Sequence, residues 1–125
     1  MIFGIGTDLC EVSRIEKSIA RLTFVRHVFA ESEQALLAGR TGKAKTESAA
    51  ANFAGKEAFL KACGTGLAGF ALREIAVLRE ESTGAPYLAF TGEAAAWMQA
   101  RRLRANISLT HDGGLASAFV ILEEN

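Results

Sequence analysis

The segment from about Thr46 to Cys63 limits the fold most, because it predicts one long helix that ends at a glycine-rich turn. Residues three, four and seven positions apart share one face of a helix. An apolar stripe is therefore expected, made up of Ala49, Phe53, Leu60 and Gly64. Glu57 lies in the middle of that stripe, where its carboxylate loses water unless a positive group meets it. Glu57 is thus either paired for structural reasons or part of a functional site.

Length and composition limit the number of domains and the kinds of partner that the chain can bind. The 125 residues, half of them hydrophobic, predict one domain over residues 1–125 with a hydrophobic core. A chain of this size leaves part of its apolar surface for contacts between subunits. The net charge of zero argues against wholesale binding to nucleic acid or to an anionic membrane.

The sequence indicates no membrane span, no signal peptide and no disulfide bond. No apolar run reaches the roughly 20 residues of a membrane span, and the N-terminus lacks the basic region of a signal peptide. Cys10 and Cys63 are isolated and lack metal-ligand spacing. We therefore expect reduced, packing thiols in a cytoplasmic protein.

Periodicity and turn residues predict the other elements. A strand is expected over 1–9, with Gly4 and Gly6 where something approaches closely. The run 13–16 has the pattern of a capping box, which would begin a helix near Ser13. The apolar stripe of that helix would comprise Val12, Ile15, Ile19 and Leu22. The remaining expectations are a helix at 32–38, loops at 40–45 and 66–71, strands at 75–79 and 87–90, a helix at 93–103 capped by Thr91, and strands at 107–110 and 116–122 joined by Asp112-Gly113-Gly114. This set predicts an α+β fold with a final antiparallel pair.

Asp8 and Glu57 are candidate metal ligands. Asp8 closes the first strand after two glycines, and Mg²⁺ takes one or two carboxylates together with phosphate oxygens and water. Lys56 and Lys61 flank Glu57 and are expected to place ammonium groups on those phosphate oxygens. The alternatives are that Asp8 caps a turn and that Glu57 pairs with Lys61, four residues on, at the helix surface.

Two further features have both a structural and a functional interpretation. The backbone N–H groups of Gly64, Thr65 and Gly66 could approach a phosphate, or these residues could simply end the helix. His111 follows Ser108 at a strand end, where it is either structural or a group that contacts a ligand or transfers a proton.

A basic face is predicted on the first helix. Arg14, Lys17 and Arg21 lie opposite its apolar stripe. Such a face is either only solvated or a docking surface for an acidic partner helix, to which it would give orientation and speed of association.

Three motifs, taken together, match a known family over nearly the whole chain and in the same order. They are Gly4-Ile5-Gly6-Thr7-Asp8-Leu9 with Arg14-Ile15, Phe53-Ala54-Gly55-Lys56-Glu57-Ala58 with Lys61-Ala62 and Gly64-Thr65-Gly66, and Ser108-Leu109-Thr110-His111 with Ala116. The chain thereby resembles the small holo-acyl-carrier-protein synthases, which are 4′-phosphopantetheinyl transferases. The resemblance implies their α+β fold, in which an antiparallel sheet packs on a long central helix.

The resemblance also implies an activity. It is the Mg²⁺-dependent transfer of 4′-phosphopantetheine from coenzyme A to a serine of apo acyl carrier protein, which releases adenosine 3′,5′-bisphosphate, in fatty acid biosynthesis. Asp8 and Glu57 would hold Mg²⁺ with the pyrophosphate, and Lys61 would complete the catalytic group. The serine proton could pass to Glu57, to an Mg²⁺-bound water or to a water held by Asp8.

Binding roles are implied in the same way. Arg14, Lys17 and Arg21 would meet the acidic helix of the carrier, and the protein would form a homotrimer with each active site between two subunits. The residues implied to contact coenzyme A are Lys43, Lys45, Lys61, Gly64, Thr65, Gly66, Ser108 and His111.

The chain departs from the family pattern where the 3′-phosphate of coenzyme A is expected to bind. Asn52 stands where an arginine is common, and Ala44 interrupts a basic cluster, for which Lys43 and Lys45 could compensate. Gly55 replaces the usual alanine, which lowers helix stability by about 1 kcal/mol. Two other classes remain as alternatives: a non-catalytic module that binds coenzyme A or the carrier, and an Mg²⁺-dependent hydrolase of nucleotide pyrophosphates.

Overall fold

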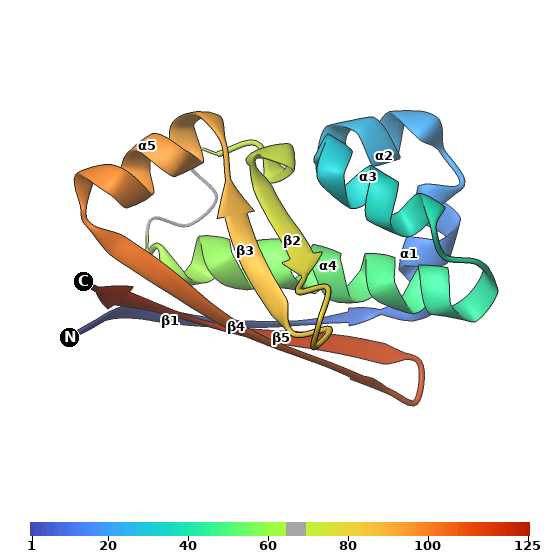
Figure 1. Ribbon diagram of the computed structural model, residues 1–125. Helices are drawn as coiled ribbons and strands as arrows, with labels where there is room; N and C mark the ends of the chain where they lie inside the picture. Colours follow the sequence, from blue (N-terminus) through green and yellow to red (C-terminus); the bar gives the residue numbers. More distant parts are fainter. Residues whose placement is uncertain (65–69) are drawn as a thin grey trace.

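A three-stranded antiparallel sheet crossed on one face by a long helix forms the base of the fold (Figure 1). The structure is a computed structural model that describes residues 1–64 and 70–125. The strand order is β1 (Ile2–Glu11), β5 (Leu115–Glu124) and β4 (Leu103–Asp112), and the helix is α4 (Gly42–Ala62). The predicted α+β fold, with an antiparallel sheet on a long central helix, is confirmed.

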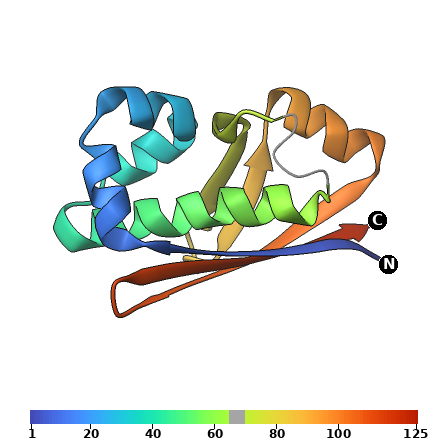
Figure 2. The same ribbon diagram turned by 180° about the vertical axis from the view of Figure 1, so that it is seen from behind.

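The other elements cover the same side of this sheet (Figure 2). Three short helices lie near the N-terminal end of α4: α1 (Val12–Ile19), α2 (Leu22–Val28) and α3 (Glu31–Ala38). Towards its other end lie the 3₁₀ turn η1 (Leu72–Glu74), the two-stranded sheet of β2 (Ile75–Arg79) and β3 (Pro86–Phe90), and α5 (Gly92–Ala100). Within residues 1–64 and 70–125, none of the helices combines the length and apolarity that crossing a bilayer requires.

Two glycines of β1 allow the sheet to touch α4 directly. A Cβ atom at Gly4 would lie 2.0 Å from the carbonyl oxygen of Ala62, and one at Gly6 would lie 2.0 Å from that of Ala58. Any side chain at either position would therefore overlap the helix backbone. The predicted close approach at these glycines is confirmed, and it fixes β1 against the C-terminal half of α4.

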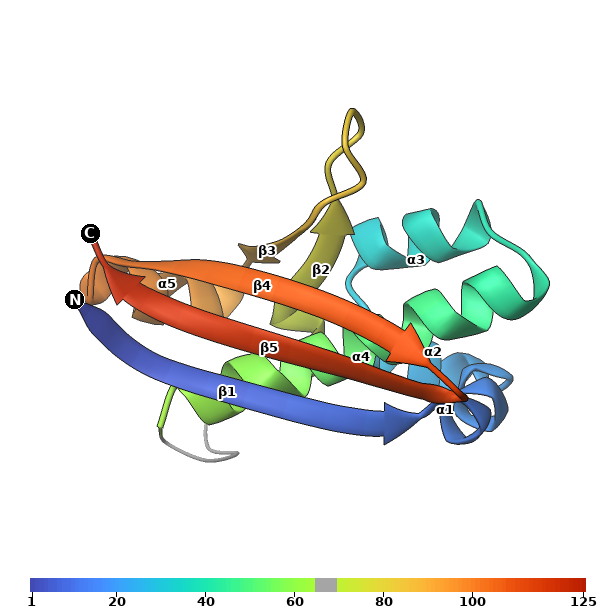
Figure 3. The same cartoon turned by 90° about the horizontal axis from the view of Figure 1, so that it is seen from below.

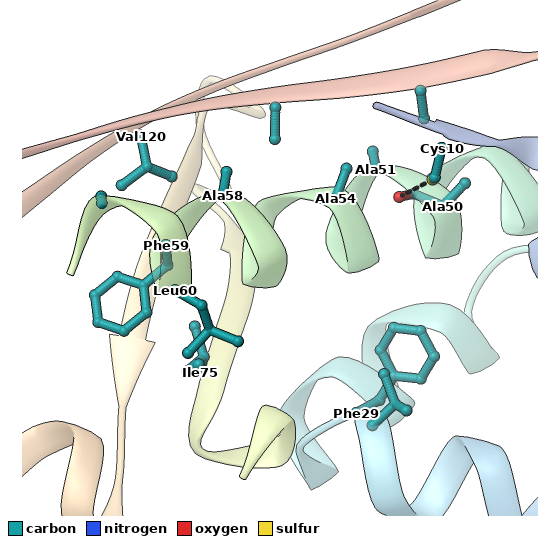
Figure 4. Packing of buried hydrophobic residues seen from close by; sticks show 14 of the residues in the cluster. Cys10, Phe29, Ala50, Ala51, Ala54, Ala58, Phe59, Leu60, Ile75 and Val120 are labelled. Atoms are coloured by element: carbon teal, nitrogen blue, oxygen red, sulfur yellow. Dashed lines mark hydrogen bonds between the residues drawn. The ribbon is translucent and has the colours of Figure 1, made fainter. Parts of the chain in front are cut away.

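Small side chains continue this tight contact along the sheet (Figure 4). Ala116, Ala118 and Val120 of β5 are buried, as are Ala54 and Ala58 of α4. On another side of α4, Phe59 packs against Phe70, Phe90 and Trp97, with ring centroids 4.8–6.5 Å apart. The helix is thus buried around most of its circumference, so a single apolar stripe does not describe it.

Both cysteines belong to this core. Cys10 donates its thiol hydrogen to the carbonyl oxygen of Ala50 at 3.3 Å (Figure 4), and Cys63 is buried as well. Burial raises the pKa of Cys10 to about 11, with a further contribution from the charge of Asp8, and burial raises that of Cys63 to about 12. The interpretation of both as reduced packing thiols is confirmed.

No helix in the described part of the chain lies on the opposite face of the sheet (Figure 3), where β1 and β5 expose apolar side chains. Side chains alternate between the two faces of a strand, so Ile5, Thr7 and Leu9 of β1 point outward. Ile5 and Leu9 are about 60% exposed, and Phe119 of β5 is 46% exposed. Exposed large apolar side chains gathered on one face are typical of a surface that another protein covers.

Several predicted boundaries were wrong. The run 40–45 is not wholly a loop, because α4 already begins at Gly42 and its lysines, Lys43 and Lys45, lie in the first turn of that helix. The predicted capping box at Ser13 does not form: α1 begins at Val12 without a side-chain cap. The helix α5 ends at Ala100, since Arg102 adopts a φ of 52° and Leu103 enters β4.

The helix α2 was missed altogether, and this changes two expectations. Leu22 was expected on the apolar stripe of the first helix, but it belongs to α2 and is 59% exposed. Arg21 was expected on the same helix as Arg14, but α1 ends at Ile19. The β-branched and aromatic composition of α2 disfavours a helix locally, and packing of Phe24 against Phe29 and Phe53 overrides that preference.

Candidate active site

Asp8 and the C-terminal half of α4 meet because β1 lies directly on that helix. Asp8 points to the α4 side of the sheet, on the same face as Gly6 and Cys10. Its side chain is only 17% exposed. Lys61, in the last turn of α4, donates from Nζ to Asp8 Oδ1 at 3.1 Å and to the carbonyl oxygen of Thr7 at 3.0 Å.

Glu57 belongs to the same cluster. Burial raises the pKa of Glu57 above its usual value, and the nearby charge of Asp8 raises it further. The charges of Lys61 and Arg14 act in the opposite direction. The structure therefore brings together the carboxylates of Asp8 and Glu57 and the cations of Lys61 and Arg14. Asp8 and Lys61 are 53 positions apart in the chain. Glu57 is half-buried. Two carboxylates that repel one another favour a bound cation.

Lys56 is not part of this cluster, which corrects the expectation that it would contact phosphate. Its side chain is fully buried and forms an ion pair with Glu33 of α3. Its ammonium group also donates to the carbonyl oxygens of Leu72 at 3.0 Å and Ile75 at 2.5 Å. Three donors are thus used within the core, and burial lowers the pKa of Lys56 while Glu33 opposes that shift.

His111 lies on the far side of α4 from Asp8. It is at the end of β4, whereas Asp8 is on β1, and β5 separates these two strands by about 10 Å. The His111 imidazole lies 3.5 Å from Glu47 Oε2 and borders a pocket of about 210 Å³. The pocket is also lined by Arg40, Ser48, Arg79 and Pro86.

The other residues implied to bind coenzyme A, where the structure describes them, lie on different surfaces. Ser108 is exposed on the outer face of the sheet, opposite to His111. Lys43 and Lys45 line a separate hollow between α1 and the start of α4. Gly64 has a φ of 76° just after the helix ends, and Thr65 and Gly66 lie outside the described residues. One chain therefore assembles the Asp8–Glu57–Lys61 group and leaves Ser108, Lys43 and Lys45 apart from it.

The predicted basic face lies next to the carboxylates. Arg14 and Lys17 are exposed on α1, and Arg21 is exposed just before α2. The charge of Arg14 is close enough to lower the pKa of Glu57 and of Cys10. A partner that docks on this face would therefore stand beside the two carboxylates.

Sequence reasoning missed the residues that surround Asn52. Asn52 is fully buried and accepts a hydrogen bond at Oδ1 from Arg79 Nη2 at 2.9 Å. Its Nδ2 group donates to Glu33 Oε2 and to the carbonyl oxygen of Val77. Neither Arg79 nor Glu33 belongs to a recognisable sequence motif. Only the presence of the polar residue Asn52 on an apolar helix face could have indicated a buried hydrogen-bond network.

Comparisons with known proteins identify the family of the chain. Residues 4–114 match the sequence model of the 4′-phosphopantetheinyl transferase superfamily. The chain is 45% identical to a holo-[acyl-carrier-protein] synthase of Methylobacterium sp. (strain 4-46), covering 98% of this chain and 95% of that protein. It is 42% identical to a protein of the same name from Lachnoclostridium phytofermentans, with 98% and 97% covered.

Solved structures of similar proteins share the fold. A holo-(acyl-carrier-protein) synthase of Bacillus anthracis, in complex with CoA (3′,5′-ADP), has a TM-score of 0.84 and 33% identity, with 100% of this chain and 99% of that chain covered. The corresponding protein of Neisseria meningitidis has a TM-score of 0.88 and 27% identity, with 99% and 100% covered. The chain belongs to the 4′-phosphopantetheinyl transferase superfamily. The resemblance based on its three motifs is confirmed, and so is its prediction as a phosphopantetheinyl transferase.

Proposed function

We propose that this protein transfers the 4′-phosphopantetheine arm of coenzyme A to a serine hydroxyl of apo acyl carrier protein and releases adenosine 3′,5′-bisphosphate. The observation that carries the proposal is the meeting of Asp8, Glu57 and Lys61 in one cluster beside the exposed Arg14. Phosphoryl transfer to a hydroxyl needs in-line positioning and neutralisation of charge more than covalent help. Close relatives named holo-[acyl-carrier-protein] synthase support the same reaction.

Mg²⁺ fits the donor set of this cluster, and Asp8 and Glu57 are its proposed ligands. Among the residues that the structure describes, no group of three or more His, Cys, Asp or Glu side chains could hold a metal. Two carboxylates suit Mg²⁺, which takes its remaining ligands from water and substrate phosphates. Burial and then the nearby charge of Asp8 raise the Glu57 pKa, and a divalent cation would relieve the repulsion between the two carboxylates. When bound, Mg²⁺ would polarise the pyrophosphate and hold it in place.

Lys61 is proposed to bind a phosphate oxygen of the substrate. Lys61 is 57% exposed, so its ammonium group can leave Asp8 and donate to a phosphate oxygen at little cost. Such a charge-assisted hydrogen bond favours the negative charge on the leaving side. Thr7, whose carbonyl oxygen accepts from Lys61, would keep that ammonium group near the cluster.

The carrier is proposed to dock on α1. Arg14 and Lys17 are exposed and three residues apart, so both can face an acidic helix, and Arg21 extends the positive surface. Charges on the rim of an interface guide orientation and association more than affinity. Docking here would deliver the carrier serine beside Glu57, because Arg14 is already near that carboxylate.

A homotrimer with active sites between subunits is part of the proposal. It is supported by the exposed apolar residues Ile5, Leu9 and Phe119 on the outer face of the sheet. It is also supported by the separation of His111 from Asp8 within one chain, since a neighbouring copy could supply the second half of a coenzyme A site. Fatty acid biosynthesis in the cytoplasm is the proposed setting.

One assay tests the function. Purified protein, apo acyl carrier protein, coenzyme A and Mg²⁺ are combined, and the carrier is weighed by mass spectrometry. We expect the mass to rise by one phosphopantetheine group, with adenosine 3′,5′-bisphosphate released in equal amount. A carrier of unchanged mass at saturating Mg²⁺ contradicts the proposal. Cleavage of coenzyme A without a carrier would instead indicate a hydrolase, and binding without any product a non-catalytic module.

A further inference from the structure

Lys56 and Glu57 are neighbours on α4, and each belongs to a different charged cluster. Lys56 forms its ion pair with Glu33 in the core, while Glu57 lies beside Asp8 of β1. Successive residues of an α-helix point about 100° apart around its axis. The direction in which α4 presents Lys56 therefore also fixes the direction in which it presents Glu57.

The ammonium group of Lys56 is held by acceptors from three elements. It donates to Glu33 of α3, to the carbonyl oxygen of Leu72 in η1 at 3.0 Å and to that of Ile75 in β2 at 2.5 Å. An ammonium group has three N–H donors, and all three are used here. Because the acceptors come from different elements, a rotation of α4 about its axis would disturb several hydrogen bonds of a buried charge at once.

Glu33 is itself held in place by other groups. Its Oε1 accepts from the backbone N–H of Ala30 at 2.9 Å, and its Oε2 accepts from that of Val77 at 3.1 Å. Oε2 also accepts from Asn52 Nδ2 at 3.1 Å. Asn52 precedes Lys56 by four residues, so the two side chains share one face of α4. One carboxylate thus holds two successive turns of the helix.

The side of α4 that faces β1 resists rotation less. At Gly4 and Gly6 the strand meets backbone atoms of the helix, so neither position provides a side chain that interlocks with it. Asp8 and Glu57 carry like charges, and their repulsion favours separation, although Lys61 offsets part of it. When no cation is bound, Glu57 must therefore be kept in place from elsewhere on α4.

We infer that Glu33 and Lys56 are positioning residues, which set the rotation of α4 about its axis and thereby hold Glu57 next to Asp8. Under the proposed function, on which this inference rests, Asp8 and Glu57 are the metal ligands. A buried ion pair is often no more stable than a well-packed neutral pair, and in some proteins its role is to fix one arrangement of the elements that it joins. Here that arrangement is the one that brings the two carboxylates together.

A neutral pair at the two buried positions separates positioning from stability. The double substitution Glu33→Gln and Lys56→Met removes both charges together, so neither is left buried alone. The crystal structure of this double variant without divalent cations should show the Glu57 carboxylate displaced from Asp8 and Lys61. Mn²⁺ binding, followed by electron paramagnetic resonance with coenzyme A and without a carrier, should weaken about ten- to a hundredfold.

Three further variants serve as controls. Met98→Ala removes buried volume from α5, so it should lower stability and leave Mn²⁺ affinity unchanged. Glu33→Asp keeps the charge and shortens the side chain by one methylene group. It should cause a smaller displacement and a smaller loss of Mn²⁺ affinity, which covers the case in which the double variant fails to fold. In a Glu57→Gln background, the double substitution should weaken Mn²⁺ binding no further, because it acts through Glu57.

The possible outcomes are distinct. Glu57 in its original place in the double variant would overturn the inference. So would a loss of Mn²⁺ affinity in Met98→Ala as large as that in the double variant, or an undiminished loss in the Glu57→Gln background. A displaced Glu57 with unchanged Mn²⁺ affinity would support the positioning role and contradict the proposed metal site.

Discussion

Lys56 forms an ion pair with Glu33 in which neither side chain is exposed to solvent. The pair joins α4 to α3, and the hydrogen bonds of its partners extend to η1 and β2. Every buried side-chain nitrogen or oxygen in residues 1–64 and 70–125 has a hydrogen-bond partner. The pair therefore belongs to a satisfied polar core, in which loss of one partner leaves the other charge buried and unpaired.

Lys56→Met should therefore lower the free energy of unfolding by about 3–5 kcal/mol, since it leaves the Glu33 carboxylate without its cation. Lys61→Met is the matched control, because Lys61 is 57% exposed, and it should change that free energy by less than about 1 kcal/mol. Urea unfolding followed by circular dichroism measures both. Equal stability of the two variants would show that the buried pair has no special role.

Gly6→Ala should destabilise the fold by at least about 3 kcal/mol, because the added methyl group would lie 2.0 Å from the backbone oxygen of Ala58. Gly39→Ala provides the comparison. A Cβ atom there would have its nearest neighbour at 3.6 Å, and φ is −81°, so stability should stay within about 0.5 kcal/mol. Thermal unfolding measures the stability of both variants. A Gly6→Ala protein as stable as the wild type would contradict the contact between β1 and α4.

Glu57→Gln should abolish transfer at ordinary Mg²⁺ concentrations, because it removes one of the two negative charges proposed to hold the metal. The rate of carrier modification is measured against Mg²⁺ concentration. Partial recovery at high Mg²⁺ would fit a weakened metal site. Unchanged turnover at low Mg²⁺ would remove Glu57 from the site.

The same substitution should stabilise the protein when no divalent cation is present. A raised carboxyl pKa means that the folded state binds the proton more tightly than the unfolded state does. Stability then falls as pH rises from the unfolded pKa of Glu57 to its higher folded pKa, and the full penalty applies above that range. The melting temperature of Glu57→Gln should exceed that of the wild type at pH 7 in EDTA. The difference should vanish at a pH well below the usual glutamate pKa, and a difference that grows with acidity would contradict the sign.

Arg14→Glu should raise the KM for the carrier by roughly tenfold at low salt, with the increase shrinking as ionic strength rises. Steady-state kinetics with apo acyl carrier protein at two salt concentrations measure this. Arg73→Glu, an exposed arginine on η1, is the control for the change in net charge. A change in the KM for coenzyme A instead would place Arg14 outside the carrier surface.

Much of the fold and of the cluster could be read from local patterns. The helical character of 46–62 follows from spacing, because a helix face is set by residues near in sequence, and the glycines at positions 4 and 6 signal a close approach without naming its partner. The start of α4 at Gly42 was not predicted. Asp8, Glu57 and Lys61 could be singled out as charged residues in specific motifs. The helix α2 could not be predicted, because its β-branched and aromatic residues become helical only when packing stabilises them.

The sequence by itself determined the family, the long helix and the identity of the charged residues. Only the tertiary structure decided which lysine beside Glu57 is buried with Glu33 and which one meets Asp8. It also placed His111 across α4 from Asp8 and brought Arg79 to Asn52. The physical reason is that the energy of a charge depends on its partners and its exposure, and both are set by elements far apart in the chain.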